Sequence, residues 1–495
     1  MAAGEGGSNR SAVLPAGVSA PGGAPVSVGT AAPRPCSEPA LRKTIGRFQF
    51  FALGFGTIIG SAWVVVLGDW LRAAAPGGAI LGFLAGGVMM GLMAAVYAEL
   101  CVRLPEAGGE FVFAHRLFGP RVGFIVGWFI ALDLIATAAF EAIALPWLLQ
   151  SLFPALRGPV LYELLGAQVT LDAVVIGVAG VVLITYLNYR DVRLAVRFQS
   201  VITYGFLIVA VLVLAAGAVS GSVENLEPLF EAPGDRSWWL GALWIFANAA
   251  FFLSGFQAIP QAIEERAEGI SARTIGQVMV GCVAAAALFY CLVVLCSSLA
   301  SPWQKLAGVP FATSVAVEGV LPGGLLAKVV LLAAAFSLLK TWNAMTLMGA
   351  RILMAQARQS MLPAWLASIH PAHATPGKAV LFVGACTIAG LFLGRGAVLP
   401  LVNMAAICLA LTFVLGCAAL LKLRRRDPGV DAGFRLPGGP WPVLIAMVGV
   451  GGMSAIALIE PWTRAGHTVP LEWILMLGWA VLGLLFRMSF RAAGK

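Results

Sequence analysis

Long apolar runs, separated by short polar segments, occupy most of the chain after residue 45. A helix needs about 20 mostly apolar residues to cross the ~30 Å hydrocarbon layer of a membrane. Each crossing must be helical, because lipid offers no hydrogen-bond partner to an unpaired backbone group. The pattern predicts an all-α integral membrane protein with 12 transmembrane helices, at residues 46–68, 79–102, 122–149, 170–188, 198–218, 238–262, 276–299, 325–355, 379–394, 397–421, 441–459 and 471–488.

Composition narrows the class of protein. Hydrophobic residues make up 60% of the 495 residues and charged residues 11%, whereas soluble domains have about 25% charged residues. This excludes a soluble enzyme and an extended nucleic-acid-binding protein, even though the net charge is +9. Residues 1–40 are rich in Ala, Gly, Pro and Ser and lack the apolar core of a signal peptide, so we expect a disordered cytoplasmic tail.

The basic residues predict an orientation. With the N-terminus in the cytoplasm, 24 Lys and Arg residues fall on the cytoplasmic side and 7 on the opposite side. Cytoplasmic loops carry an excess of such residues, so both termini are expected inside, and the run Lys422–Arg426 is interpreted as a stop at the lipid headgroups. Arg outnumbers Lys by 25 to 7, a bias that indicates a GC-rich bacterial source and hence a multi-pass protein of the cytoplasmic (inner) membrane.

Two of the predicted helices contain an interruption. The first run includes Gly54–Ser61 and the sixth includes Ser254–Gln261, with Pro260 inside it. Glycine weakens a helix by about 1 kcal/mol, and proline removes a hydrogen-bond donor. Small residues also serve close helix packing, which stays an alternative for either segment alone. The two interruptions lie five runs apart, the spacing expected of two halves inserted with opposite topology around a transporter's binding site.

An interrupted membrane helix leaves backbone groups without partners. Half-helix N-termini carry positive partial charge and suit a carboxylate, whereas C-termini and free carbonyls suit an ammonium. A zwitterionic amino acid or a small amine fits such a site without any buried ionic side chain.

The chain resembles the amino acid–polyamine–organocation permeases from about residue 44 to 425. The sequence of its segment 259–265 is similar to that of the ethanolamine and amino acid branch. The motifs that carry the resemblance are Gly54–Ser61, Tyr97–Leu100, Pro105–Phe111, Gly255–Glu265, Arg351–Pro363, His370-Pro371 and Thr375-Pro376. The resemblance implies the leucine-transporter fold, a 5+5 inverted repeat plus two extra helices. The repeats would cover residues 41–220 and 238–425, and residues 426–495 would hold helices 11 and 12.

The resemblance also implies a binding site at the two breaks. The implied substrate-binding residues are Thr57, Ile58, Gly60, Ser61, Ala62, Phe251, Ser254, Gly255, Phe256 and Gln257. Amides of Gly60, Ser61 and Ala62 and the Ser61 hydroxyl would face a carboxylate. The Ile58 carbonyl and those near Phe251 and Ser254 would face an amine, with Phe251 as an aromatic gate. The chain departs from many relatives in having Ala62 for Gly and Gln257 for Glu.

Three ionisable residues fall at membrane depth, where charge is costly and often functional: Asp133, Glu141 and Lys340. Three interpretations stay open. Lys340 couples transport by occupying the place of a sodium ion, Asp133 and Lys340 form a structural ion pair, or Asp133 or Glu141 binds a cationic substrate. Glu99, at the end of the second run, lies near Arg103, His115, Arg116 and Arg121 and is expected to belong to a solvated interfacial cluster, with a cytoplasmic gate salt bridge as the alternative.

These observations predict a secondary active transporter of amino acids or small amines that works by alternating access, coupled to protons or working by exchange. A transport-inactive amino acid sensor and a specific ethanolamine or polyamine permease are the alternatives. We expect no enzyme activity, no cofactor and no metal. The expected partners are the substrate, protons and membrane lipid. Residues 150–170 contain no cysteine, so a disulfide-linked heavy chain is not expected.

Overall fold

The computed structural model describes residues 43–106, 108–231, 237–428, 433–465 and 469–493, and the predicted tail at 1–40 lies outside them. The longer helices are α1 Arg47–Ile58, α3 Leu67–Arg103, α4 Gly109–Phe118, α5 Pro120–Leu152, α6 Leu171–Arg190, α7 Val192–Ser220, α8 Trp238–Phe252, α10 Ala272–Ala300, α13 Leu325–Arg358, α14 Gly377–Leu391, α15 Val398–Arg426, α16 Trp441–Ala465 and α17 Leu471–Ala493. The short helices are α2 Ala62–Val65, α9 Ala258–Gln261, α11 Trp303–Leu306 and α12 Ala312–Ala316. The 3-10 turns are η1 Pro154–Leu156, η2 Val223–Leu226, η3 Ile263–Glu265, η4 Pro322–Gly324, η5 Ala364–Ala367 and η6 Arg395–Ala397.

The helices confirm a multi-pass membrane protein. Within the described ranges, nine helical segments are long and apolar enough to cross a membrane. Three shorter apolar helices, Trp238–Phe252, Gly377–Leu391 and Trp441–Ala455, fall on the sixth, ninth and eleventh predicted runs. Every predicted run therefore coincides with a helix, while the count of twelve crossings and the 5+5 repeat stay predictions.

Helix α3 joins the first predicted run to the second. Ala75 inside it has φ 53° and ψ 174°, and Pro76 follows. This backbone is non-helical, and Pro76 has no N–H to continue the helical hydrogen bonds. Residues 67–103 are therefore two helices that meet at Ala75, which places the turn between the first two predicted runs.

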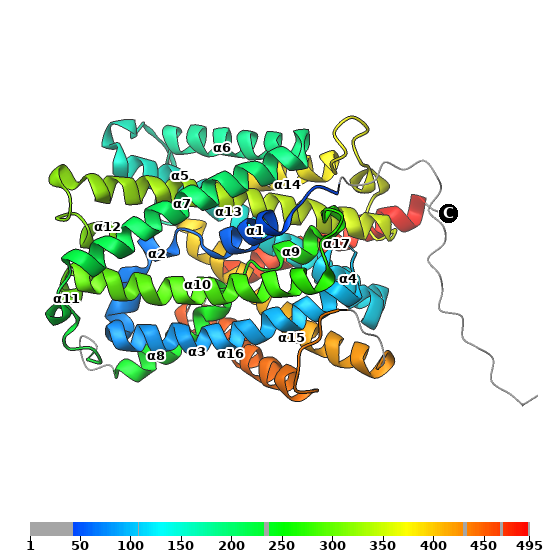
Figure 1. The fold of residues 1–495 in the computed structure, drawn as a ribbon. Coiled ribbons are helices and arrows are strands. Elements are labelled where there is room, and N and C mark those ends of the chain that lie inside the picture. Colours follow the sequence, from blue (N-terminus) through cyan, green and yellow to red (C-terminus); the bar gives the residue numbers. More distant parts are fainter. Residues whose placement is uncertain (1–42, 107, 232–236, 429–432, 466–468, 494–495) are drawn as a thin grey trace, which may run out of the picture. The chain divides into compact units, whose positions relative to one another are not determined.

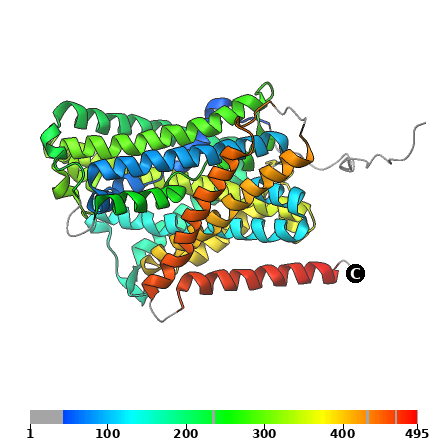
Figure 2. The same cartoon turned by 90° about the horizontal axis from the view of Figure 1, so that it is seen from below.

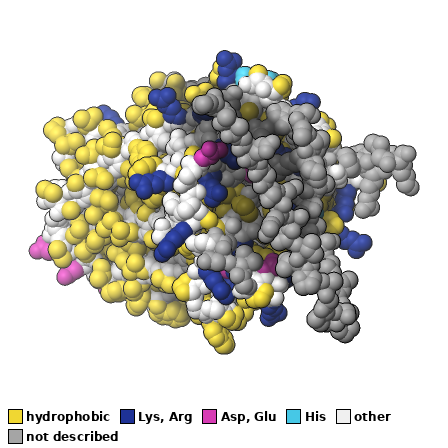
Figure 3. Space-filling model, turned by 45° about the vertical axis from the view of Figure 1, so that its right-hand side comes forward, with side chains coloured by type: hydrophobic (Ala, Val, Ile, Leu, Met, Phe, Trp, Pro, Cys, Tyr) yellow, Lys and Arg dark blue, Asp and Glu magenta, His cyan; other side chains and the backbone are white. Residues whose placement is uncertain are grey.

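Two groups of helices pack side by side. Helix α3 lies along α8 and α10, and α5 lies along α13 and α15 (Figures 1 and 2). Buried alanines and glycines allow close approach: a Cβ on Gly86 would lie 2.2 Å from the Ala249 side chain of α8. On the face in Figure 3, apolar side chains cover the left part, and most Lys and Arg side chains lie from the centre to the right. This separation is typical of a protein whose middle faces lipid.

The segment between α5 and α6 contains two short strands that the pattern of apolar runs does not predict. Strands β1 Val160–Leu164 and β2 Ala167–Thr170 pair antiparallel, with Leu164 opposite Ala167. Leu165 and Gly166 between them both have positive φ, 53° and 71°. That is the backbone of a two-residue hairpin turn, and the glycine favours it.

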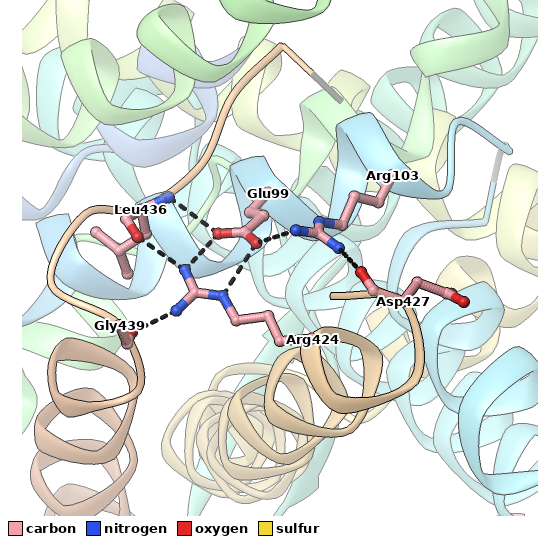
Figure 4. A network of polar contacts seen from close by, with 6 residues as sticks. All are labelled: Glu99, Arg103, Arg424, Asp427, Leu436 and Gly439. Carbon is pink, nitrogen blue, oxygen red and sulfur yellow. Dashed lines mark hydrogen bonds and ion pairs between the residues drawn. The ribbon is translucent and has the colours of Figure 1, made fainter. Parts of the chain in front are cut away.

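Glu99 corrects the sequence analysis, because it is fully buried instead of solvated (Figure 4). Its carboxylate lies 3.0 Å from Arg103 and 2.5 Å from Arg424 at the end of α15, and it accepts a 2.9 Å hydrogen bond from the Leu436 N–H. Arg424 also donates to the carbonyls of Leu436 and Gly439. Arg424 therefore does more than stop the helix at the headgroups: with Glu99 it fixes the segment after α15 against α3.

We expect Glu99→Gln to destabilise the protein by about 3 kcal/mol, because two nearly buried guanidinium groups lose their counter-charge. Glu106→Gln is the matched control, since the side chains of Glu106 and its partner Arg116 are 35% and 42% exposed, and exposed pairs contribute about 1 kcal/mol or less. Thermal unfolding of the detergent-solubilised variants measures the difference. Equal unfolding temperatures for the two variants would contradict this account of the Glu99 network.

Candidate functional site

The first break lies between α1 and α2, where the sequence placed it. Helix α1 ends at Ile58, Ile59 has extended backbone (φ −86°, ψ 90°), and α2 begins at Ala62. Helix α2 continues into α3 through Val66, whose backbone is right-handed helical. The N–H groups of Ser61 and Ala62 have no hydrogen-bond acceptor among the described residues, as expected at a half-helix N-terminus.

The second break lies between α8 and α9. Helix α8 ends at Phe252, Gly255 has φ +120°, and α9 begins at Ala258. The Gln257 side chain accepts a 2.6 Å hydrogen bond from the Gly255 N–H and so replaces a missing helical partner. The break confirms the prediction, but Pro260 is not part of it. Pro260 lies in the first turn of α9, where a missing N–H costs nothing because those donors have no partner within the helix.

The two breaks touch each other. A Cβ added to Gly255 would lie 2.7 Å from the Ile58 nitrogen and 2.8 Å from the Thr57 carbonyl carbon. Both atoms are backbone, so they cannot move aside as a flexible side chain would. Position 255 must therefore be glycine for two reasons: its backbone has positive φ, and α1 leaves no room for a Cβ atom.

A cavity of about 1290 Å³ lies beside both breaks. Eleven of the predicted residues line it: Thr57, Ile58, Gly60, Ser61, Ala62, Asp133, Glu141, Phe251, Ser254, Gly255 and Gln257. Phe256 does not line it: its ring is fully buried and stacks on Phe413 with centroids 5.9 Å apart. The residue packs away from the cavity because the backbone turns at Gly255.

Lys340 also lies outside the lining, although it contacts the first break. Its ammonium donates to the Gly56 carbonyl at 2.7 Å and to the Ile59 carbonyl, and the Phe206 ring centroid is 4.9 Å away. The ion pair with Asp133, one of the three interpretations left open by the sequence, is not formed among the described residues. The ammonium instead sits at the C-terminal end of α1, where the helix dipole favours positive charge.

The Phe251 carbonyl, one of the proposed amine acceptors, is already in use. It accepts a 2.8 Å hydrogen bond from the Ser254 hydroxyl. The Ile58 carbonyl likewise accepts a 3.1 Å hydrogen bond from the Gly60 N–H. A carbonyl oxygen has two lone pairs, so the Ile58 carbonyl keeps capacity for one further donor. The Phe251 carbonyl also accepts a 3.4 Å hydrogen bond from the Ser254 N–H, so both of its lone pairs are in use.

The cavity extends between two unlike ends. One end is marked by Arg72, whose side chain is 64% exposed, beside Asp69. The other end is formed by Glu110 of α4 and Gln261 of α9, which are 3% and 1% exposed. The cavity therefore reaches the surface at the Arg72 end and is covered at the Glu110 end, which is the predicted cytoplasmic end.

Contacts near η3 hold the covered end closed. The Thr44 and Ile45 N–H groups donate to the Glu265 carbonyl at 2.8 and 2.9 Å, and the Ala267 N–H donates to Ile45 at 3.0 Å. The Glu265 carboxylate accepts a 2.5 Å hydrogen bond from Arg351 of α13, and both side chains are buried. The chain before α1, the turn after α9 and α13 are thus linked on the covered side.

Glu110 and Gln261 are site residues that the sequence analysis missed. Gln261 donates a 2.5 Å hydrogen bond to the Glu110 carboxylate. A Cβ on Gly109, at φ +44°, would lie 2.6 Å from the Gln261 amide nitrogen, so this glycine allows α4 to approach α9. Burial raises the pKa of Glu110 from 4.5 to about 7. The available sequence signal for this site was Glu110, which directly follows Gly108 and Gly109. Its partner Gln261 could not be identified from the sequence, because it lies 151 residues away.

This raised pKa predicts a pH dependence. The folded protein keeps a proton on Glu110 that the unfolded chain has lost, so the resulting stabilisation is complete below pH 4.5 and lost as the pH rises to about 7. Relative to Glu110→Gln, the wild type is expected to lose about 3 kcal/mol of stability across that window. Thermal unfolding at pH 4.5 to 8 checks this, with Glu106→Gln as the exposed control. Parallel pH profiles for wild type and Glu110→Gln would contradict it.

Comparison with known proteins decides the family. The sequence pattern of the amino acid permease family matches residues 45–485. The chain belongs to this family. The permease is similar to the methylthioribose transporter of Bacillus subtilis (strain 168), with 26% identity over 90% of the permease and 93% of the relative.

Other relatives are named as amino acid carriers. The branched-chain amino acid permease of Bacillus subtilis (strain 168) is 25% identical over 81% of the permease and 85% of its own length. The large neutral amino acids transporter small subunit 2 of Rattus norvegicus is 28% identical over 80% of the permease and 73% of its own length. The permease is therefore a multi-pass membrane transporter of the amino acid–polyamine–organocation superfamily and not an enzyme.

Proposed function

We propose that the protein is a secondary active transporter that moves amino acids or small amines across the cytoplasmic membrane by alternating access. The observation that carries this proposal is the contact between two broken helices beside one cavity, with Gly255 of one break against Thr57 and Ile58 of the other. Unpaired backbone groups at such breaks are suited to a small charged metabolite.

The first break offers opposite partial charges to the two ends of an amino acid. The N–H groups of Ser61 and Ala62, which have no acceptor in the part of the chain that the structure describes, begin the half-helix that continues into α3, and they suit a carboxylate. The Ile58 carbonyl, at the end of α1, suits an ammonium. Thr57, Gly60, Phe251, Ser254 and Gln257 complete the proposed binding surface, and Phe256 is left as a packing residue.

Alternating access is supported by the unlike ends of the cavity. Access at the Arg72 end and closure at the Glu110 end are the features of an outward-facing state, if both termini lie in the cytoplasm as the basic residues predict. The inward-facing state then requires separation of Glu265 from Arg351 and of Ile45 from Ala267. We keep twelve crossings, arranged as a 5+5 inverted repeat plus two helices, as part of this proposal.

Lys340 is the proposed coupling residue. Its ammonium bridges the Gly56 and Ile59 carbonyls, on both sides of the point where α1 ends. Loss of the proton removes the donor that holds these two carbonyls together, so protonation and the shape of the first break are linked. Proton coupling and exchange both fit this arrangement. A sensor that binds without transporting is the second candidate, because the same site serves binding alone.

The proposal is tested by uptake into proteoliposomes of radiolabelled leucine, alanine, lysine, ethanolamine and putrescine, with and without a pH gradient. We expect saturable uptake of at least one compound above that of protein-free liposomes. Acceleration by an acidic exterior supports proton coupling, and acceleration by internal substrate supports exchange. Binding of a compound without uptake of any supports the sensor, and absence of both binding and uptake contradicts the proposed function.

A further inference from the structure

The cavity wall carries an excess of acidic side chains. Among the described residues that line it, four are acidic, Asp69, Glu110, Asp133 and Glu141, and one is basic, Arg72. Arg72 and Asp69 pair with each other at 3.0 Å at the exposed end. The buried part of the lining is left with three carboxyl groups and no basic side chain within the described ranges.

Two buried oxygen atoms on this wall have no partner. Glu141 Oε2 and Gln261 Oε1 each lack a hydrogen-bond donor among the described residues, and these residues are 3% and 1% exposed. Both residues line the cavity. Leaving a buried acceptor unpaired is costly, so such atoms are satisfied by a group that enters the site. Both are acceptors, and an entering ammonium or guanidinium supplies only donors.

Lys340 does not satisfy Glu141 by direct contact. Its ammonium is used by the carbonyls of Gly56 and Ile59, and it forms no ion pair within 4.0 Å of a described carboxylate. Even with Lys340 counted, the ionisable groups at membrane depth near the cavity are two carboxyl groups, those of Asp133 and Glu141, against one ammonium. The surplus favours a ligand with net positive charge, because an unpaired charge in a low-dielectric site attracts its opposite strongly.

Asp133 and Glu141 line a different wall of the cavity from the two breaks. Asp133 and Glu141 are eight residues apart on α5, which corresponds to about 12 Å along the helix axis. Both lie on the wall formed by α5, whereas Ser61 and Gly255 lie on the wall formed by the breaks. A ligand that bridges these two walls is held at the breaks by one end and faces the carboxyl groups of α5 with the other.

We infer that the substrate carries a second cationic group, as in a basic amino acid or a diamine, and that Glu141 binds that group. This inference rests on the proposed transport function and specifies its substrate class. Glu110, at the covered end, extends the acidic surface toward Gln261.

The test uses two pairs of probes in proteoliposome uptake, and each pair differs by one amino group. Lysine is compared with norleucine, and putrescine with butylamine. We expect the compound with two amino groups, lysine or putrescine, to have a KM at least tenfold lower than its match with one amino group in at least one pair. Glu141→Gln should raise that KM at least tenfold and change the KM of the match by less than twofold.

Control variants keep the test decisive. Glu163→Gln, in the exposed strand β1, should leave every KM unchanged. If Glu141→Gln fails to fold, the wild-type comparison within each pair of probes decides the inference by itself, and equal KM values within both pairs would overturn it. Uptake of norleucine or leucine with lysine and putrescine rejected would overturn this inference and preserve the transport function. Equal effects of Glu141→Gln on both members of a pair would overturn it as well. Folded protein that takes up no probe at all refutes the transport function and the inference together.

Discussion

Lys340→Met is expected to reduce uptake at least tenfold at every pH. The substitution preserves an unbranched apolar stem but removes the donor to the Gly56 and Ile59 carbonyls. Two buried acceptors would lose this donor, which costs about 1–3 kcal/mol for each group left unpaired. The Ser337 hydroxyl still reaches Ile59 at 3.2 Å, so the Gly56 carbonyl is the more affected. Initial uptake rates in proteoliposomes measure the effect.

Lys328→Met is the matched control for this prediction. Lys328 lies three turns earlier on the same helix, α13, and is exposed, so its loss should leave the uptake rate unchanged. Lys340→Arg distinguishes a coupling role of Lys340 from a purely structural role, because arginine stays charged at all accessible pH values. If Lys340 couples, the arginine variant binds substrate but loses the pH dependence of uptake. Wild-type uptake by Lys340→Met at every pH would remove Lys340 from the mechanism.

Gly255→Ala is expected to reduce substrate binding and uptake to a tenth or less. Alanine at φ +120° is strained by about 1–3 kcal/mol, and its Cβ would lie 2.7 Å from the Ile58 nitrogen. The two breaks would have to separate, which displaces the backbone groups of both. Binding by scintillation proximity and uptake in proteoliposomes report the two effects separately.

Gly281→Ala provides the control for the glycine substitution. Gly281 lies in α10, and a Cβ there would meet no atom within 4 Å, so alanine should retain binding and stabilise the helix by about 0.5–1 kcal/mol. Gly60→Ala is informative in another way, since its Cβ would lie 3.7 Å from the Thr341 hydroxyl in ordinary contact. We expect this variant to fold but to bind more weakly, because the methyl group enters the cavity. Full binding by Gly255→Ala would mean that contact between the breaks is not required.

The structural features that depend on local sequence patterns could be predicted from the sequence. Apolar runs predicted the helices, because membrane-spanning segments must be both long and apolar. Glycines at 54–60 and at 255 predicted the two breaks, because helix weakening is a property of the residue itself. Pro260 was misplaced for the same reason: proline disrupts the interior of a helix, but α9 begins only two residues before it.

Features that depend on distant residues could not be predicted. Glu99 meets Arg424 across 325 residues, and Glu110 meets Gln261 across 151. An ion pair with Asp133 was one of three open interpretations of Lys340, but its ammonium binds two backbone carbonyls, and a carbonyl is present at every position of the sequence. The turn at Gly255 directs Phe256 away from the cavity, and this direction follows from φ and not from residue type. Tertiary contacts decide the first three cases, and the backbone conformation at Gly255 decides the fourth.

The central claim is that backbone groups at two helix breaks hold the substrate. The most direct measurement is a cryo-electron microscopy map of the protein with the amino acid or amine that is taken up most rapidly. We predict ligand density between Gly255 and the first break, within hydrogen-bond distance of the Ser61 and Ala62 nitrogens. Density bound elsewhere, with the cavity beside both breaks empty, would contradict the account.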